Sequence, residues 1–276
     1  MRTSHLSFEK LLEGISGNLF QELPPSFKEV DIYFQPLVDL EKNEIFGYEA
    51  LARPLSGEPI LVLIQRAIQE NFLGLFDLYL RLKAIYRAYE LEIFPEKYLF
   101  LNVTPNCLLK KRPSGITLNL LKALNLPRER IVLEIGESYL PEDYGKFYET
   151  LHYFKKQGFK IAVDDFGVGC ISYKVLWEFP PDYVKIDRFF VQQNQNPFFE
   201  KVIYHFIELA KDLKIELIVE GVEREEEVLF FLDLGINLMQ GFFFGKPLLI
   251  PHREEKKLRG FKSSYEVHLI NPLWAF

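Results

Sequence analysis

Short apolar runs alternate with longer amphipathic stretches along this chain. Eight runs rich in β-branched and aromatic residues predict strands at 30–40, 44–52, 98–104, 131–136, 160–165, 183–187, 215–221 and 238–243. Between them, apolar positions with a helical period predict two helices within 60–91 and single helices at 115–126, 143–157, 197–213 and 224–234. Gly158 and Gly235 follow two of these stretches, where a helix C-terminus often needs a left-handed residue. Strands and helices therefore alternate over most of the chain.

The first two strands are joined differently from the others. Only the polar turn Glu41-Lys42-Asn43 separates them, which is too short for a helical crossover and favours an antiparallel hairpin. The expected fold class is α/β, a modified TIM (β/α)8 barrel with one antiparallel strand near its start. Because no Gly-, Ser- or Pro-rich linker divides the chain, we expect one barrel domain over 29–250. An N-terminal arm over 1–28, whose structure the pattern does not define, would precede it. A C-terminal tail over 251–276, packed on or near the barrel, would follow it.

Composition narrows the class of protein. The chain has 276 residues, 48% of them hydrophobic, and a net charge of −6, values typical of a globular protein and not of a non-specific nucleic-acid binder. No run of about 18 apolar residues is free of charges, and residues 1–10 lack the apolar segment of a secretory leader. Two cysteines, Cys107 and Cys170, cannot build a disulfide framework, so the reducing cytoplasm is the expected compartment.

Polar residues stand at the C-terminal end of one predicted strand after another. They are Glu49, Asn102, Glu134, the pair Asp164-Asp165, Lys185, Glu220 and Gln240. An ionised group in an apolar strand is expensive to bury without a compensating cation or hydrogen bonds. In a barrel these strand ends meet at one mouth, where the active sites of this architecture lie. The pattern as a whole predicts a shared site.

Each of these residues alone also fits a plainer interpretation. Asn102 is typical of a turn or helix cap, and Glu134 of a partly buried ion pair. Asp164-Asp165 fits an acidic helix cap, while Lys185 fits a structural partner for one of the carboxylates. Their recurrence on successive strand ends is what favours a functional site.

The residue types indicate which ion such a site would take. Carboxylate and amide oxygens are hard ligands that suit Mg2+ or Mn2+. Adjacent aspartates with several glutamates can hold two such ions, an arrangement that activates water for phosphoester hydrolysis. Five scattered histidines offer no competing cluster, and the sequence contains no Gly-x-Ser-x-Gly, Walker or Gly-x-Gly-x-x-Gly motif. The expected cofactors are two Mg2+ or Mn2+ ions per site.

In their order, these residues resemble the EAL-domain family of cyclic di-GMP phosphodiesterases over residues 33–247. The matching motifs are Glu49-Ala50-Leu51, Asn102, Glu134, Asp164-Asp165-Phe166-Gly167, Lys185-Ile186-Asp187, Glu220-Gly221-Val222-Glu223 and Gln240-Gly241. The resemblance implies a barrel with one antiparallel strand. It also implies a metal-dependent enzyme that hydrolyses its small-molecule substrate, cyclic di-GMP, to linear pGpG with Mg2+ or Mn2+.

The same resemblance implies roles for individual residues. Glu49, Lys185 and Glu220 look like the catalytic group, with Glu220 as a base toward water and Lys185 as the residue that orients it. The implied metal ligands are Glu49, Asn102, Glu134, Asp164, Asp165 and Glu220. The implied substrate contacts are Gln35, Leu51, Arg53, Gln240 and Pro247. The residues expected to support these ligands and the loop after the fifth strand are Glu137, Glu223, Asp187 and Ser172.

The sequence departs from the family pattern in three places, one of which is Pro54, where an aromatic residue is frequent. Gly136 stands where family members usually carry Thr, and Val168, Cys170 and Ile171 replace the usual residues of the loop after the fifth strand. A degraded loop is linked in this family to receptors that bind without cleaving. The leading hypothesis is an active phosphodiesterase. The alternatives are a cyclic di-GMP receptor or scaffold with little turnover, and an unrelated metal-dependent barrel enzyme.

Two hypotheses concern assembly. The resemblance implies a homodimer formed through the barrel surface near the altered loop. The N-terminal arm over 1–28 is a candidate contact for a protein partner. Neither membrane insertion nor a nucleic-acid polymer is expected as a partner.

Overall fold

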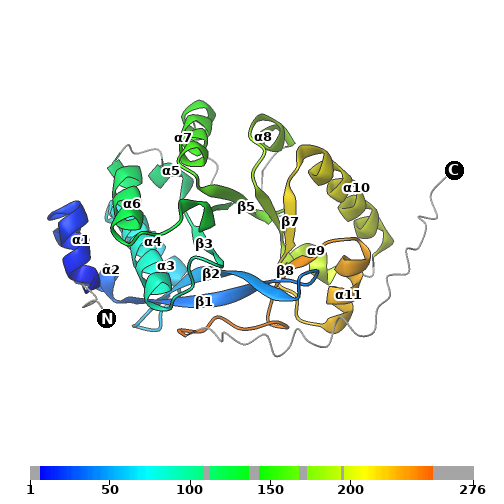
Figure 1. Cartoon of the computed structure of the whole chain (residues 1–276), viewed down its shortest axis with the longest axis horizontal. Coiled ribbons are helices and arrows are strands. Elements are labelled where there is room, and N and C mark those ends of the chain that lie inside the picture. The colour runs from blue at the N-terminus through cyan, green and yellow to red at the C-terminus, as the bar shows by residue number, and fades with distance from the viewer. Residues whose placement is uncertain (1–6, 109–111, 137–142, 168–172, 194–195, 251–276) are drawn as a thin grey trace.

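The computed structural model describes residues 7–108, 112–136, 143–167, 173–193 and 196–250. Its centre is a closed barrel of strands that pair in chain order (Figure 1). The strands are β1 (Val30–Asp39), β2 (Glu44–Pro54), β3 (Tyr98–Asn102), β4 (Ile131–Gly136), β5 (Lys160–Phe166), β6 (Tyr183–Ile186), β7 (Glu216–Val219) and β8 (Leu238–Gln240). β1 runs antiparallel to both neighbours, β2 and β8, whereas the other neighbouring pairs are parallel. The predicted α/β fold, a modified TIM barrel with one antiparallel strand, is confirmed.

Helices surround the barrel and connect its strands. Those described are α1 (Phe8–Ser16), η1 (Leu19–Gln21), α2 (Pro25–Lys28), α3 (Ile60–Gln69), α4 (Leu73–Glu90), α5 (Pro105–Leu108), α6 (Arg112–Ala123), η2 (Arg128–Arg130), α7 (Tyr144–Lys156), α8 (Tyr173–Glu178), α9 (Arg188–Gln192), α10 (Pro197–Leu213) and α11 (Glu225–Asp233). The amphipathic stretches of the sequence correspond to α3, α4, α6, α7, α10 and α11. The sequence pattern misses α5, α8 and α9, since one or two turns are too short to show a period. Over the described residues, no helix combines the length and apolar character needed to cross a bilayer.

Capping side chains explain where two outer helices begin. Asn196 accepts a hydrogen bond from the backbone N–H of Phe198 at 3.0 Å, and Pro197 occupies the first position of α10. Asp143 caps α7 in the same way, accepting from the backbone N–H of Lys146 at 3.1 Å. Both starts follow from local sequence and do not depend on the barrel.

The barrel interior is filled by an apolar layer. Its buried members are Leu37, Phe100, Val132, Ala162, Tyr183, Ile218 and Leu238, with Phe46 of β2 packed against them. From β3 to β8, each member lies two residues before one of the polar residues predicted for the site. Side chains two residues apart in a strand point to the same face, so the polar residues form the next layer toward the C-terminal mouth. The core thus supplies a rigid floor beneath the site.

The N-terminal segment packs on the barrel's helices. α1 contacts α6, and the two lie side by side in Figure 1. Phe8, Leu12 and Phe20 are buried in the main hydrophobic cluster. The Phe8 ring lies 5.7 Å from that of Tyr79 and 5.3 Å from that of Tyr86, both on α4. Residues 8–28, expected as an arm of undefined structure, therefore contain α1, η1 and α2 and contribute to the core of the domain.

Five strands end one to three residues earlier than the sequence predicts. β1, β3, β6, β7 and β8 stop at Asp39, Asn102, Ile186, Val219 and Gln240, not at residues 40, 104, 187, 221 and 243. Gly221 has φ +67°, outside the strand region. At Gly241 a Cβ atom would overlap the backbone of Val222, so the chain leaves the barrel through a close crossing of two backbones.

Candidate functional site

The polar residues predicted at the strand ends converge on one lysine. Lys185 lies on β6 and is wholly buried. Its Nζ atom lies 2.6 Å from Glu134 Oε1 and 2.6 Å from Glu220 Oε1. Asp164 Oδ1 lies 3.0 Å from the same nitrogen, and Glu49 Oε2 lies 3.4 Å from it. These carboxylates come from β2, β4, β5 and the end of β7, so the site joins strands from around the barrel.

The site holds more negative than positive charge. With Asp165 beside Asp164, several carboxylates face the ammonium group of Lys185. Burial raises the pKa of Glu134 and of Glu220 well above the usual range, and neighbouring carboxylates raise both further against the opposing effect of Lys185. Burial by itself would lower the pKa of Lys185, but the surrounding carboxylates raise it well above its usual value. The electrostatics of this mouth therefore favour the uptake of further positive charge.

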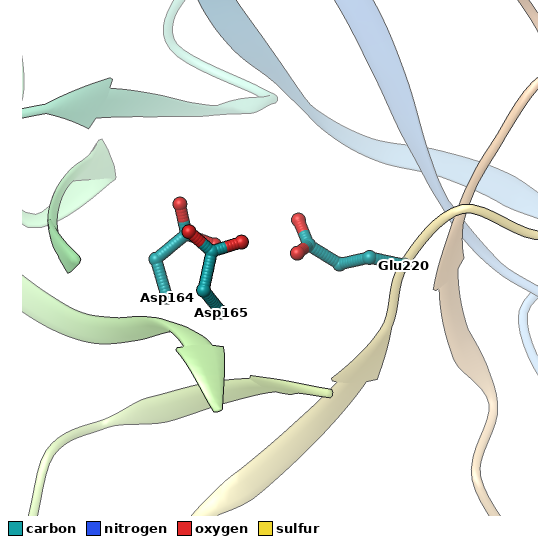
Figure 2. Close-up of side chains that lie close together, drawn as sticks. All are labelled: Asp164, Asp165 and Glu220. Atoms are coloured by element: carbon teal, nitrogen blue, oxygen red, sulfur yellow. The ribbon is translucent and has the colours of Figure 1, made fainter. Parts of the chain in front are cut away.

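An irregularity in β5 brings two adjacent aspartates to the same place. Successive side chains of a regular strand point to opposite faces, which would separate Asp164 from Asp165. The pairing of β5 with β6 shifts register between Val163 and Phe166, and Asp165 has the left-handed φ of +55°. As a result Asp164, Asp165 and Glu220 each offer a carboxylate oxygen within 4.8 Å of the others, and all three point into one space (Figure 2). Burial, then the charges of Asp164 and Asp187, raise the pKa of Asp165 to about 6.

Two amides fix the carboxylate of Glu49. Asn102 Nδ2 donates a hydrogen bond to Glu49 Oε1 at 2.8 Å. Gln240 Nε2 donates to Glu49 Oε2 at 2.7 Å, so residues on β3 and β8 hold β2's glutamate from either side. Glu49 is thereby oriented toward Lys185 with both oxygens engaged.

The donor set fits divalent metal ions. Oxygen donors from carboxylates and an amide are the ligand type of Mg2+ and Mn2+. Glu134 Oε2 is buried and has no hydrogen-bond partner in the described part of the chain. A buried carboxylate oxygen without a partner is costly, and a metal ion would satisfy it. The excess of carboxylates over cations in this site also favours a bound metal ion.

A small pocket opens beside these carboxylates. Its volume is about 230 Å³, and its lining residues are Gln35, Glu49, Asp187, Arg188, Glu220, Gly221, Glu223, Gln240, Gly241 and Phe242. Gln35 pairs in register with Glu49 and donates from Nε2 to the carbonyl of Gly245 at 3.2 Å. Arg188 and Phe242 are not among the residues predicted from the sequence. The signal available was their position, directly after the Asp187 and Gln240-Gly241 motifs.

Other predicted residues lie around this centre in less direct positions. Asp187 caps α9 by accepting from the backbone N–H of Phe189 at 2.7 Å. Glu223 was expected to tether the loop after β5; in the described residues its carboxylate Oε1 pairs with Arg188 Nη2 at 3.0 Å. Arg53 lies on β2 and donates from Nη1 to the carbonyl of Ala52 at 3.0 Å. It does not line the pocket described above.

The remaining predicted positions fall into two groups. Leu51 is a half-buried residue of β2, and Pro247 precedes Leu248, whose backbone pairs with Phe34 of β1. Glu137, Val168, Cys170, Ile171 and Ser172 lie outside the described residues. Gly136 ends β4 and pairs in register with Asp164.

The fold and the site together define a modified (β/α)8-barrel protein with an acidic, cation-favouring centre at the C-terminal ends of its strands. Residues 19–247 match the model of the EAL domain family. The chain belongs to the EAL domain family.

Solved structures of known proteins share this fold. A standalone versatile EAL protein from Vibrio cholerae O395, in its c-di-GMP bound form, superposes with a TM-score of 0.74 and 33% sequence identity over 79% of this chain and 92% of that chain. BlrP1 of Klebsiella pneumoniae, in a complex with manganese and cyclic di-GMP, superposes with a TM-score of 0.74 and 26% identity over 80% of this chain and 56% of that chain. The structures of both relatives therefore contain cyclic di-GMP.

Curated relatives include enzymes and a regulator. The cyclic di-GMP phosphodiesterase RocR of Pseudomonas aeruginosa is 31% identical over 81% of this chain and 59% of its own length. The blue light- and temperature-regulated antirepressor BluF of Escherichia coli is 28% identical over 78% of this chain and 54% of its own length. An uncharacterized signaling protein of Caulobacter vibrioides is 33% identical, and the chain spans 28% of its length. The chain thus covers only part of these relatives.

Proposed function

We propose that this protein is a metal-dependent phosphodiesterase that hydrolyses cyclic di-GMP to linear pGpG. The observation that carries the proposal is the carboxylate centre itself, in which Glu49, Glu134, Asp164 and Glu220 contact Lys185 beside Asp165. A merely structural lysine needs one carboxylate partner, and here a buried excess of negative charge is maintained. Membership of the EAL domain family, with a phosphodiesterase and cyclic di-GMP-bound proteins among the relatives, supports the choice of substrate.

Two Mg2+ or Mn2+ ions would be held by Glu49, Asn102, Glu134, Asp164, Asp165 and Glu220. When bound, such ions activate water and neutralise the charge that develops on the phosphate. Because the ions supply the positive charge, a chain with a net charge of −6 needs no basic surface to bind an anionic substrate.

The chain's own side chains orient the reactants. Lys185 carries its proton at Nζ and can donate to an oxygen placed among the carboxylates. Glu220, whose pKa is raised by burial, lies 2.6 Å from that nitrogen and is suited to accept a proton from water. Gln35 and Gln240 line the pocket and can offer their amides to a substrate. Leu51, Arg53 and Pro247 stay substrate contacts by resemblance alone.

The test is hydrolysis of cyclic di-GMP with Mg2+ or Mn2+, followed by chromatography of the products. We expect linear pGpG from the native protein, none in the presence of a chelator, and a loss of about 100-fold or more in Glu49→Ala. Glu49→Gln is the matched variant, since it keeps the side chain's size and removes its charge. Equal product from native protein and from both variants would refute the proposed role of the centre.

A second candidate function is a cyclic di-GMP receptor with little turnover. Gly136, paired with Asp164, brings no side-chain hydroxyl to the edge of the site, and one relative is named an antirepressor. Binding of cyclic di-GMP without product, in the presence of either metal, would favour this candidate. A Gly136→Thr variant that gains turnover would then identify the position responsible.

A further inference from the structure

Three consecutive phenylalanines after β8 have different surroundings. Phe243 and Phe244 pack against the hydrophobic cluster formed around β6, β7 and β8. Phe242 instead is 50% exposed and lines the same pocket as Glu49 and Glu220. A half-exposed phenylalanine ring forgoes part of the stabilisation that burial gives. Packing therefore accounts only in part for its position at the mouth of the candidate active site.

The backbone fixes where the Phe242 ring stands. Gly241 crosses the backbone of Val222 so closely that a Cβ atom would overlap it. Phe243 N–H donates to the carbonyl of Val222 at 3.0 Å, and Gly245 N–H donates to the carbonyl of Gly241 at 3.1 Å. Gln35 holds the far end of this turn through the Gly245 carbonyl at 3.2 Å. The ring is thus carried on a turn with defined hydrogen bonds.

A positive charge lies close to this ring. The Lys246 ammonium is 5.4 Å from the centroid of Phe242, within the range of a cation–π contact. The pocket therefore has a carboxylate side, which includes Glu49 and Glu220, and an aromatic residue, Phe242, beside which Lys246 lies outside the pocket lining. An aromatic face next to a cation is the combination that binds a nucleobase and its attached phosphate, because every base can stack on a ring whatever its sequence.

We propose that Phe242 is a stacking platform for one guanine base of cyclic di-GMP, an assignment that rests on the proposed function for its choice of ligand. Phe242 then determines affinity and specificity and takes no part in bond breaking. The carboxylate side holds the scissile phosphodiester, while the ring holds a base beside it.

The first test measures the Kd of cyclic di-GMP by calorimetry with the whole chain. Ca2+ is the added ion, because BlrP1 also forms a complex with calcium and cyclic di-GMP. We expect Phe242→Ala to raise Kd roughly five- to hundredfold. Phe242→Tyr keeps an aromatic face and should stay within about twofold of the native protein, whereas Phe242→Leu keeps apolar bulk without a π-face and should resemble Phe242→Ala. Phe198→Ala, at a phenylalanine of α10 that is 68% exposed, is the matched control. An unchanged Kd in Phe242→Ala, or equal Kd values for Leu and Tyr, would overturn the proposal.

The second test separates this proposal from the proposed function. Bis(p-nitrophenyl) phosphate is a phosphodiester without a nucleobase, so its metal-dependent hydrolysis reports on the carboxylate centre. We expect the loss of kcat/KM in Phe242→Ala to be at least about fivefold larger for cyclic di-GMP than for this ester. Losses of equal size would overturn the platform while leaving the hydrolase intact. If the native protein cleaves neither ester, the proposed hydrolase activity is refuted, and the Kd series alone tests whether Phe242 stacks on a base. If the native protein does not bind cyclic di-GMP, both the proposed function and the role of Phe242 are refuted.

Discussion

Lys185 balances a group of carboxylates that would otherwise repel one another. Its side chain is fully buried, and Glu134, Asp164 and Glu220 all lie within 3.0 Å of its nitrogen. Removing one partner of a buried ion pair leaves an uncompensated charge and costs about 3–5 kcal/mol. Divalent ions held by these carboxylates would offset the same negative charge. We therefore expect Lys185 and bound metal ions both to stabilise the mouth of the barrel.

Replacing Lys185 with Met keeps the length of the side chain and removes its charge. We expect the variant, in chelator, to lose about 3–5 kcal/mol of unfolding free energy, and Mg2+ or Mn2+ to restore more stability to it than to the native protein. Urea unfolding with and without metal measures both effects. Lys156→Met, at an exposed lysine of α7, should change the unfolding free energy by less than about 0.5 kcal/mol. Identical curves for native protein and Lys185→Met in chelator would contradict this account.

At the scale of elements, α4 positions the end of β3. Asp77 on α4 accepts a hydrogen bond from the backbone N–H of Thr104 at 2.8 Å and pairs with Arg81 Nη2 at 2.6 Å. Thr104 lies two residues after Asn102, which holds Glu49. A helix outside the barrel thus fixes the loop that follows a site residue.

Asp77→Ala removes both contacts and leaves the buried Arg81 guanidinium without this partner. We expect a loss of about 3–5 kcal/mol in unfolding free energy. Asp77→Asn keeps an acceptor for Thr104 N–H, so it should be destabilised less than Asp77→Ala. Asp212→Ala, at an exposed aspartate of α10, controls for the loss of a surface charge. Urea denaturation ranks the variants, and an Asp77→Ala protein as stable as the Asp212→Ala control would rule out a positioning role.

At the scale of the whole molecule, the folded unit extends beyond the family match. The match begins at residue 19, yet Phe8 and Leu12 of α1 lie in the main core. Contacts of Phe8 with Tyr79 and Tyr86 tie this helix to α4. We infer that α1 stabilises the barrel, which leaves less of the N-terminal segment available to a separate partner.

Phe8→Ala should lower the unfolding free energy by about 3 kcal/mol, because a buried aromatic ring is lost and a cavity is left. Removal of residues 1–17 should destabilise the protein by a similar or larger amount. Glu13→Ala, on the exposed side of the same helix, is the matched control. Thermal unfolding measures all three, and a truncated chain with the native Tm would show that α1 is dispensable for the fold.

The arrangement of elements could be predicted because local sequence patterns specify it. Strand-length apolar runs alternate with helical periods, and the turn at Glu41-Lys42-Asn43 is too short for a crossover, so the antiparallel β1 follows from spacing alone. The short helices α5, α8 and α9 could not be predicted, because one or two turns show no period. The early ends of β7 and β8 could not be predicted either, because the chain after them depends on the backbone crossing of Gly241 against Val222, which joins segments distant in sequence.

The sequence by itself determined the barrel, the order of its strands and the residue types at its mouth, because period and position along each strand decide which side chains face inward. Only the tertiary structure decided that Glu49, Glu134, Asp164 and Glu220 share one lysine, since their contacts span four strands. It alone brought Asp165 beside Asp164, through a register shift and a left-handed φ that strand alternation does not predict. Local backbone geometry determines the direction in which a side chain points, and packing across the barrel determines which other side chains it contacts.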